Sequence, residues 1–156
     1  MPLILKTGAC ALGMIILGGL GATVTSGSID GWYASLNRPP GTPPNWVFDP
    51  VWSVLYFMIG ISFALVWHKL GRAFFKSPAF TVFAVQLLLN LAWTPVFFGA
   101  HWIGVALLII IAMIGSILLT IRKFSPHSKP AAWLLVPYLL WVCYATYLNA
   151  GYLMLN

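Results

Sequence analysis

The sequence predicts an all-α protein, an integral membrane bundle of five transmembrane helices with a long structured first loop. Of its 156 residues, 61% are hydrophobic and only 6% are charged, whereas a soluble domain averages roughly 25% charged residues. The apolar runs are continuous over about the 20 residues that a helix needs to cross a bilayer. They do not alternate as the strands of a membrane β-barrel do. We expect residues 1–156 to form a single transmembrane domain.

Five segments fit a membrane span. The predicted helices cover residues 3–25, 49–68, 79–99, 102–121 and 131–155. A secretory signal peptide is the alternative for the first segment, but its apolar part is longer than the usual stretch of about 7–15 residues. No A-x-A cleavage site follows it, so we interpret it as an uncleaved span. Pro137, near the start of the last segment, predicts a kink there.

The basic residues predict how the bundle sits in the membrane. The side that holds the N-terminus carries seven of the eight Lys and Arg residues: Lys6, Lys69, Arg72, Lys76, Arg122, Lys123 and Lys129. Only Arg38 lies on the other side, with the acids Asp30 and Asp49. This asymmetry predicts a cytoplasmic N-terminus and an outside C-terminus in a bacterial inner or plasma membrane. Lipid headgroups, and not nucleic acid, are the expected partner of the net charge of +6.

Small residues recur four positions apart, a spacing that lets membrane helices approach closely. The pairs are Ala9/Gly13, Gly18/Ala22, Gly60/Ala64 and Ala112/Ser116. They predict tight packing between helices and a homodimer formed through the Gly-rich first helix.

The long first loop, residues 26–48, has an unusual composition. Its prolines fix φ and remove hydrogen-bond donors, so we expect a stiff, non-helical segment. Trp32, Tyr33, Trp46 and Phe48 are more aromatics than a spacer needs. Two interpretations stay open: an aromatic belt at the membrane interface, or a lid folded over the mouth of a cavity.

Ionisable side chains are missing from the middle of every predicted span. This argues against proton pumps and voltage sensors and removes the usual general acids and bases. Cys10 and Cys143 are isolated in apolar runs, and His68, His101 and His127 fall at the ends of spans. We therefore expect no metal site and no structural disulfide.

Polar and aromatic side chains share faces of the helices. Gln86, Asn90 and Thr94 are spaced i, i+4, i+8, with Trp93 beside them. Amides in a membrane commonly form hydrogen bonds between helices, and contact with a ligand is the alternative.

Aromatic faces occur on the second and fifth predicted helices as well. Trp141, Ala145 and Leu148 are spaced i, i+4, i+7, and Trp52 pairs with Tyr56. For any one pair, helix packing is the simpler interpretation. Three such faces in one small bundle favour an apolar pocket for a flat ligand.

Four stretches together resemble a known family. They are W-Y-x-x-L-x-x-P at 32–39, P-P-x-W-V-F-x-P-V-W-x-x-L-Y at 43–56, Q-L-x-x-N-x-x-W-x-P-x-F-F-G at 86–99 and P-Y-L-x-W-x-x-x-A-T-x-L-N at 137–149. In order and spacing the chain resembles the TspO/MBR family, and in particular its bacterial members. This family comprises the bacterial tryptophan-rich sensory proteins and the mitochondrial translocator protein, or peripheral benzodiazepine receptor.

The resemblance implies a dimeric five-helix bundle with a ligand cavity under the first loop. Family members bind porphyrins such as protoporphyrin IX, and drugs of the isoquinoline carboxamide and benzodiazepine types. The candidate ligand-binding residues combine the positions that the resemblance implies with further residues on the same loop and helix faces. They are Trp32, Trp46, Trp52, Tyr56, Gln86, Asn90, Trp93, Phe98, Trp141, Ala145 and Leu148.

Three positions depart from the family pattern. Gly41 stands where many members carry a further Trp before the P-P-x-W motif, so we expect less complete closure over a ring. Val105 replaces a Trp of the animal members. The cholesterol motif of animal members needs a basic residue after a Tyr, and none follows Tyr152, so specific cholesterol binding is not expected.

Three functions compete. The first is a tetrapyrrole receptor that transports or senses porphyrins, and we favour it. The second is a light- and oxygen-dependent enzyme that degrades porphyrin, for which Trp52 and Trp141 are the candidate residues. The third is a scaffold that acts through protein partners. None of them requires a bound cofactor, because the porphyrin is the ligand.

Overall fold

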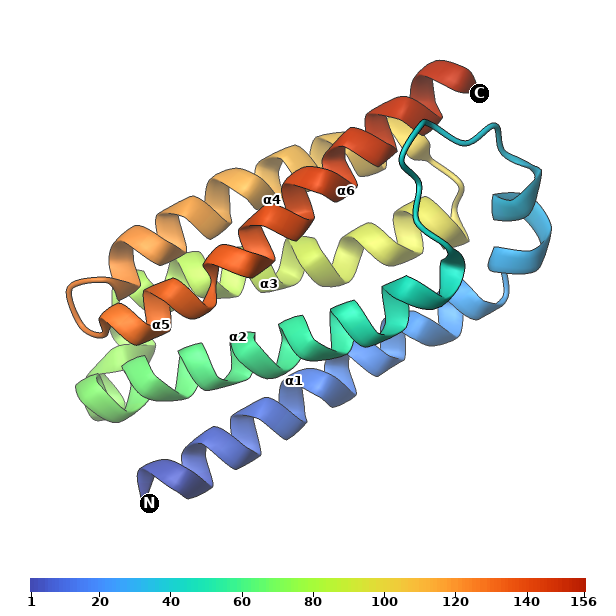
Figure 1. Cartoon of the computed structure of the whole chain (residues 1–156). Coiled ribbons are helices and arrows are strands. Elements are labelled where there is room, and N and C mark those ends of the chain that lie inside the picture. Colours follow the sequence, from blue (N-terminus) through green and yellow to red (C-terminus); the bar gives the residue numbers. More distant parts are fainter.

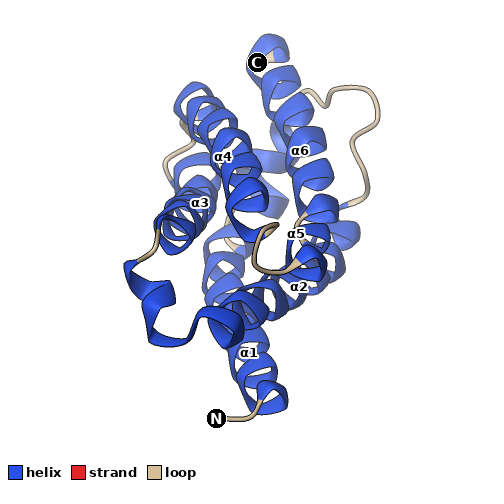
Figure 2. Ribbon diagram, turned by 90° about the vertical axis from the view of Figure 1, so that its left-hand side faces the viewer, coloured by secondary structure: helices blue, strands red, loops and turns tan.

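The computed structural model describes residues 1–156 and contains helices and loops without strands (Figure 2). Its helices are α1 (Leu3–Ser26), α2 (Phe48–Leu70), α3 (Pro78–Thr94), α4 (Ile103–Phe124), α5 (Lys129–Leu134) and α6 (Val136–Leu155). Shorter helical turns are η1 (Ile29–Tyr33), η2 (Asn45–Val47), η3 (Gly71–Lys76) and η4 (Pro95–Gly99). Five helical segments are long and apolar enough to cross a membrane, so the predicted all-α bundle of five spans is confirmed.

The long helices lie side by side in an elongated bundle (Figure 1). α1 packs along α2, α3 along α4, and α6 against α4. Leu88, Leu108 and Leu140 point outward and are exposed, which suits contact with lipid tails because these are as apolar as leucine.

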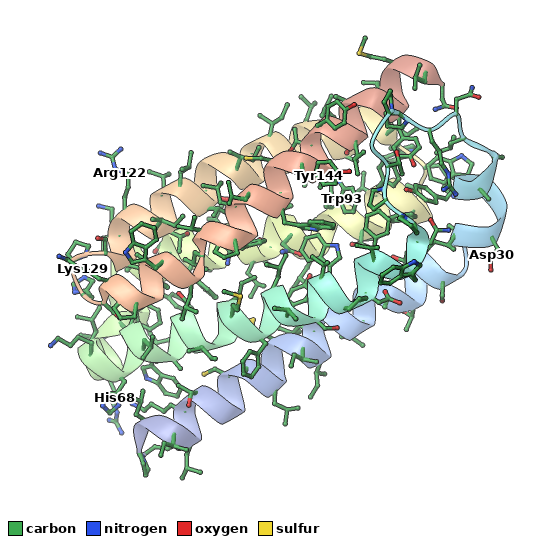
Figure 3. The ribbon with its side chains drawn as sticks, in the orientation of Figure 1. Asp30, His68, Trp93, Arg122, Lys129 and Tyr144 are labelled. Atoms are coloured by element: carbon green, nitrogen blue, oxygen red, sulfur yellow. The ribbon has the colours of Figure 1, made fainter.

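One end of the bundle is filled by aromatic side chains. Phe74, Phe83 and Phe124 are fully buried there, and the rings of Phe83 and Phe124 stack with centroids 5.8 Å apart. His68, Arg122 and Lys129 lie at this same end (Figure 3). The space for a ligand is therefore at the other end of the helices.

Prolines interrupt two of the predicted spans. Pro137 has no N–H, and the last span breaks at Leu135 into α5 and α6, as the predicted kink requires. Pro95 likewise ends α3 at Thr94, and the chain continues as the wider π-helical turn η4. The peptide then reverses through His101, whose φ of 61° is unusual for a residue with a side chain.

The predicted non-helical loop is wrong at both ends, because its last residues, Asn45–Val47, form the helical turn η2 and its first part is helical as well. α1 extends to Ser26, and Ile29–Tyr33 form the π-helical turn η1. Residues 29–33 contain no proline, and the turn buries Tyr33 against the rest of the bundle. The chain leaves the helical conformation only in residues 36–44, which contain the prolines and which we call the strap.

The strap is fastened to α6. The Tyr144 hydroxyl donates to the Gly41 carbonyl, and the Tyr147 hydroxyl donates to the Pro40 carbonyl at 2.7 Å. Pro39 lies so close to Gly151 that a Cβ added to this glycine would be 2.5 Å from the Pro39 ring. In Figure 1 the strap crosses the end of the bundle beside the last turns of α6.

Gly41 gives the strap its turn. Its φ of 85° lies in the region that favours glycine, and the Thr42 N–H donates to the Pro39 carbonyl at 3.3 Å to close the turn. A tryptophan here would have to adopt a strained backbone, so the departure at Gly41 has a local physical reason.

Candidate functional site

A cavity lies between α1, α2, α3 and α6, at the end of the bundle that carries η1 and the strap. It contains about 900 Å³ of space free of atoms, including the part open to the outside, and 13 of its 20 lining residues are hydrophobic. The lining comprises Gly18, Gly21, Ala22, Thr25, Ile29, Tyr33, Phe48, Asp49, Trp52, Tyr56, Asn90, Trp93, Thr94, Phe97, Phe98, Trp141, Ala145, Leu148, Asn149 and Tyr152.

Aromatic rings from three helices form the walls. Trp52 on α2 lies 5.7 Å from the Tyr56 ring, and Trp141 on α6 meets Phe48 edge to face at 6.1 Å. Trp93 on α3 stacks on Phe97 of η4 at 5.1 Å. The three aromatic faces predicted from spacing therefore converge on one cavity.

A chain of hydrogen bonds forms the inner end of the cavity. The Tyr56 hydroxyl donates to Asn90 Oδ1 at 2.6 Å, and Asn90 Nδ2 donates to the Tyr138 hydroxyl oxygen at 2.7 Å. The Tyr138 hydroxyl in turn donates to Gln86 Oε1 at 2.8 Å. This series of hydrogen bonds joins α2, α3 and α6. The side-chain amides of Asn90 and Gln86 therefore have the interhelical bonds expected of polar groups in a membrane.

Two of the indole N–H groups at the cavity differ in their partners. Trp93 Nε1 donates to Asn149 Oδ1 at 3.0 Å, and Asn149 Nδ2 donates to the Ile103 carbonyl at 2.9 Å. Trp141 Nε1 is buried and has no hydrogen-bond partner. Burial of this donor without a partner costs about 1–3 kcal/mol.

The outer wall contains a pair of tyrosines that spacing did not reveal. The Tyr152 hydroxyl donates to the Tyr33 oxygen at 2.8 Å. Burial and this hydrogen bond raise the pKa of the Tyr33 hydroxyl above its ordinary value. The Arg38 guanidinium lies over the Tyr33 ring, 5.8 Å from its centroid, so one cation stands one ring away from the cavity.

Small residues of α1 form the remaining wall, which the sequence reasoning also missed. Gly18, Gly21, Ala22 and Thr25 are spaced i, i+3, i+4, i+7 and all line the cavity. A Cβ on Gly18 would lie 2.3 Å from ring atoms of Tyr56, so glycine is needed there to admit the ring. The signal was present in the Gly18/Ala22 pair, which we interpreted only as helix packing.

Eight of the eleven candidate residues line the cavity, and three lie elsewhere. Trp32 stacks on the His101 ring with centroids 4.0 Å apart. Trp46 is 73% exposed and points away, as a residue of an interfacial belt does. Gln86 is buried behind Asn90 at 1% exposure, and its Nε2 has no partner.

Comparison with known proteins gives one consistent result. The model of the TspO/MBR family matches residues 9–155. The Tryptophan-rich protein TspO of Chlorobaculum tepidum is 39% identical over 100% of this chain and 96% of its own length. That of Archaeoglobus fulgidus is 40% identical over 98% of both chains. The Translocator protein of Bos taurus is 42% identical over 85% of this chain and 80% of its own.

Proposed function

The chain belongs to the TspO/MBR family and is a multi-pass integral membrane protein, and we propose that its cavity binds a tetrapyrrole such as protoporphyrin IX. Family membership supports a membrane sensor or receptor role. A relative from Cereibacter sphaeroides, 36% identical, is named Tryptophan-rich sensory protein, and the Bos taurus relative is named a translocator. We propose that binding here leads to sensing or to transport of the porphyrin.

The observation that carries this proposal is the convergence of three indoles on one cavity beside a small residue. Trp52, Trp93 and Trp141 all line it, and Ala145 lies one helical turn from Trp141. Each well-placed aromatic contact contributes about 0.5–1.5 kcal/mol beyond the burial of area. A flat macrocycle can use several such contacts at once, and a methyl group at position 145 leaves room for its edge.

The polar groups suggest how the ligand is oriented. Propionates of a porphyrin would point toward the outer wall, where Arg38 lies over Tyr33, because a guanidinium pairs well with carboxylates. Asp49, also in the lining, would repel them from the α2 side. Trp141 Nε1, which has no protein partner, would donate to an acceptor on the ligand. The same apolar cavity would accept drugs of the isoquinoline carboxamide and benzodiazepine types.

The test is a titration of the detergent-purified protein with protoporphyrin IX in the dark, followed by quenching of tryptophan fluorescence. We expect saturable quenching in the micromolar range, strongly weakened by Ala145→Phe. Leu140→Phe is the matched control, because Leu140 lies on the same helix but is exposed toward lipid. Equal affinity in Ala145→Phe and the parent protein would place the ligand outside this cavity.

Degradation of the porphyrin in light is the second candidate, because Trp52 and Trp141 both line the cavity. An illuminated porphyrin transfers its excitation to dioxygen, and the resulting singlet oxygen attacks the macrocycle or an indole. No general acid or base is needed for this. If degradation is the role, Trp141→Phe should retain much of the binding and lose the light-dependent spectral change. Equal spectral change in both proteins would make the photochemistry incidental.

A further inference from the structure

A second cavity lies in the wall between α1 and α3. It contains about 560 Å³ of space, including its open part. Its lining is mostly aliphatic and comprises Leu17, Leu20, Gly21, Val24, Tyr56, Leu91, Thr94 and Pro95. Leu20 is 63% exposed, so this side cavity opens on the surface that faces lipid.

The side cavity and the main cavity share three residues. Gly21 on α1, Tyr56 on α2 and Thr94 on α3 line both. Because Gly21 has no side chain, nothing from α1 fills the space opposite Thr94. A Cβ on Gly21 would lie only in ordinary contact, 3.7 Å from Thr94 Cγ2. The partition between the two cavities is therefore thin.

The other contacts of α1 are much tighter. Against α2, a Cβ on Gly60 would lie 2.5 Å from Ala11 Cα, so the two backbones touch. Beyond Val24, the Ser28 hydroxyl donates to the Phe98 carbonyl at 2.5 Å and closes the outer end. The side cavity extends along α1 from Leu17 to Val24.

At its outer end the main cavity is lined by Tyr33 and Tyr152, which are hydrogen-bonded to each other, and the neighbouring strap is bonded to α6. Besides the two tyrosine bonds to the strap, the Asn37 N–H donates to Asn156 Oδ1 at 2.9 Å, and Asn156 Nδ2 donates to the Asn37 carbonyl at 3.1 Å. A ligand passing there must break several hydrogen bonds. In the side cavity it needs only a movement of aliphatic side chains and of the Tyr56 ring.

We propose that the gap between α1 and α3 is a side entrance through which a flat apolar ligand passes between the bilayer and the main cavity. This rests on the proposed binding function. The Tyr56 ring is the inner gate, held in place by its hydrogen bond to Asn90. Asn90 is a positioning residue in this scheme, since Tyr56 and Tyr138 occupy its two amide atoms.

A reversible cross-link tests the entrance. A Cβ at position 21 would lie 3.8 Å from Thr94 Cβ, which is the mean separation in disulfides. The variant is Gly21→Cys/Thr94→Cys, made with Cys10→Ala and Cys143→Ala. It is studied oxidised and reduced in phosphatidylcholine vesicles, with protoporphyrin IX binding followed by stopped-flow quenching in the dark. The two single-cysteine variants, treated identically, are the controls.

Closing the entrance should lower both the association rate and the dissociation rate about tenfold or more, which corresponds to a barrier higher by about 1.4 kcal/mol. Because Gly21 and Thr94 also line the main cavity, the rates are compared between the oxidised and reduced forms of the same double variant. Unchanged rates would overturn the side entrance. Absence of saturable binding in every form would instead overturn the proposed function.

A second variant tests the entrance even if the disulfide does not form. Leu91 lines the side cavity but not the main one, so Leu91→Trp fills the route without touching the binding site. It should slow both rates as the cross-link does. Rates equal to those of the parent protein would overturn the entrance, whatever the cysteine variant does.

Discussion

Replacing Asn90 with leucine tests whether this amide joins the helices or contacts the ligand. Its Oδ1 accepts a hydrogen bond from Tyr56 at 2.6 Å, and its Nδ2 donates to Tyr138 at 2.7 Å. Asn90 is 3% exposed and Tyr56 is 8% exposed, so water does not easily replace a lost partner. Leucine is close to asparagine in shape, and the change therefore removes bonds with little change in packing.

The expected loss of stability depends on which hydrogen bonds Tyr138 and Tyr56 keep in the variant. Tyr138 still donates to Gln86 at 2.8 Å, whereas the Tyr56 hydroxyl loses its acceptor. A buried group left unsatisfied costs about 1–3 kcal/mol, and interhelical bonds measured in a membrane average about 0.6 kcal/mol. We expect Asn90→Leu to lower the free energy of unfolding by about 1–2 kcal/mol, and Tyr56→Phe by about 0.5–1 kcal/mol.

A double-mutant cycle makes the test specific. In Tyr56→Phe/Asn90→Leu both partners are apolar, so its cost should be smaller than the sum of the two single costs by about 1 kcal/mol. The assay is reversible unfolding in mixed detergent micelles, with protoporphyrin IX titration of the same proteins. Additive costs, or an Asn90→Leu variant that loses more binding energy than stability, would refute the interhelical role and make Asn90 a ligand contact.

Three further predictions concern the strap, the first helix and the outer cation. Tyr144→Phe with Tyr147→Phe should speed amide hydrogen exchange in the strap, since two bonds from α6 are lost; unchanged protection would mean that other contacts hold it. We propose that the open face of α1, where nothing lies within 4 Å of Gly13, joins two copies. Gly13→Leu should then lower the dimer fraction seen by light scattering, and an unaltered fraction would place the interface elsewhere. Arg38→Gln should weaken protoporphyrin IX binding about three- to tenfold, as expected for one exposed ion pair of about 1 kcal/mol, but not that of its uncharged dimethyl ester. Equal losses for both ligands would exclude a role for charge.

Sequence patterns suffice for the spans because hydropathy and helix length are local properties. The five spans, the kink at Pro137 and the aromatic face of Trp141 and Ala145 all follow from residue types and their spacing. The same patterns do not show what a face meets. The Gly18/Ala22 pair predicted close packing of helices, and the structure places it at the wall of the cavity.

The loop was the hardest segment to predict, because its conformation depends on residues more than a hundred positions away. Its proline composition correctly indicated a non-helical strap but hid the helical turn at Ile29–Tyr33. Tyr144 and Tyr147 fasten the strap to α6, and no periodicity in the loop indicates these partners. Trp32 and Trp46 looked equivalent in the sequence, yet one stacks on His101 and the other is exposed.

Binding of the ligand among the indoles of the main cavity is tested by comparing two tryptophans in the dark titration with protoporphyrin IX. Trp141 lines the cavity, whereas Trp133 on α5 lies outside it and is 71% exposed. Removing a strongly quenched tryptophan lowers the quenched share of the fluorescence, and removing a weakly quenched one raises it. If the porphyrin lies in the cavity, this share at saturation should fall in Trp141→Phe and rise in Trp133→Phe. The reverse pattern would place the porphyrin outside the cavity.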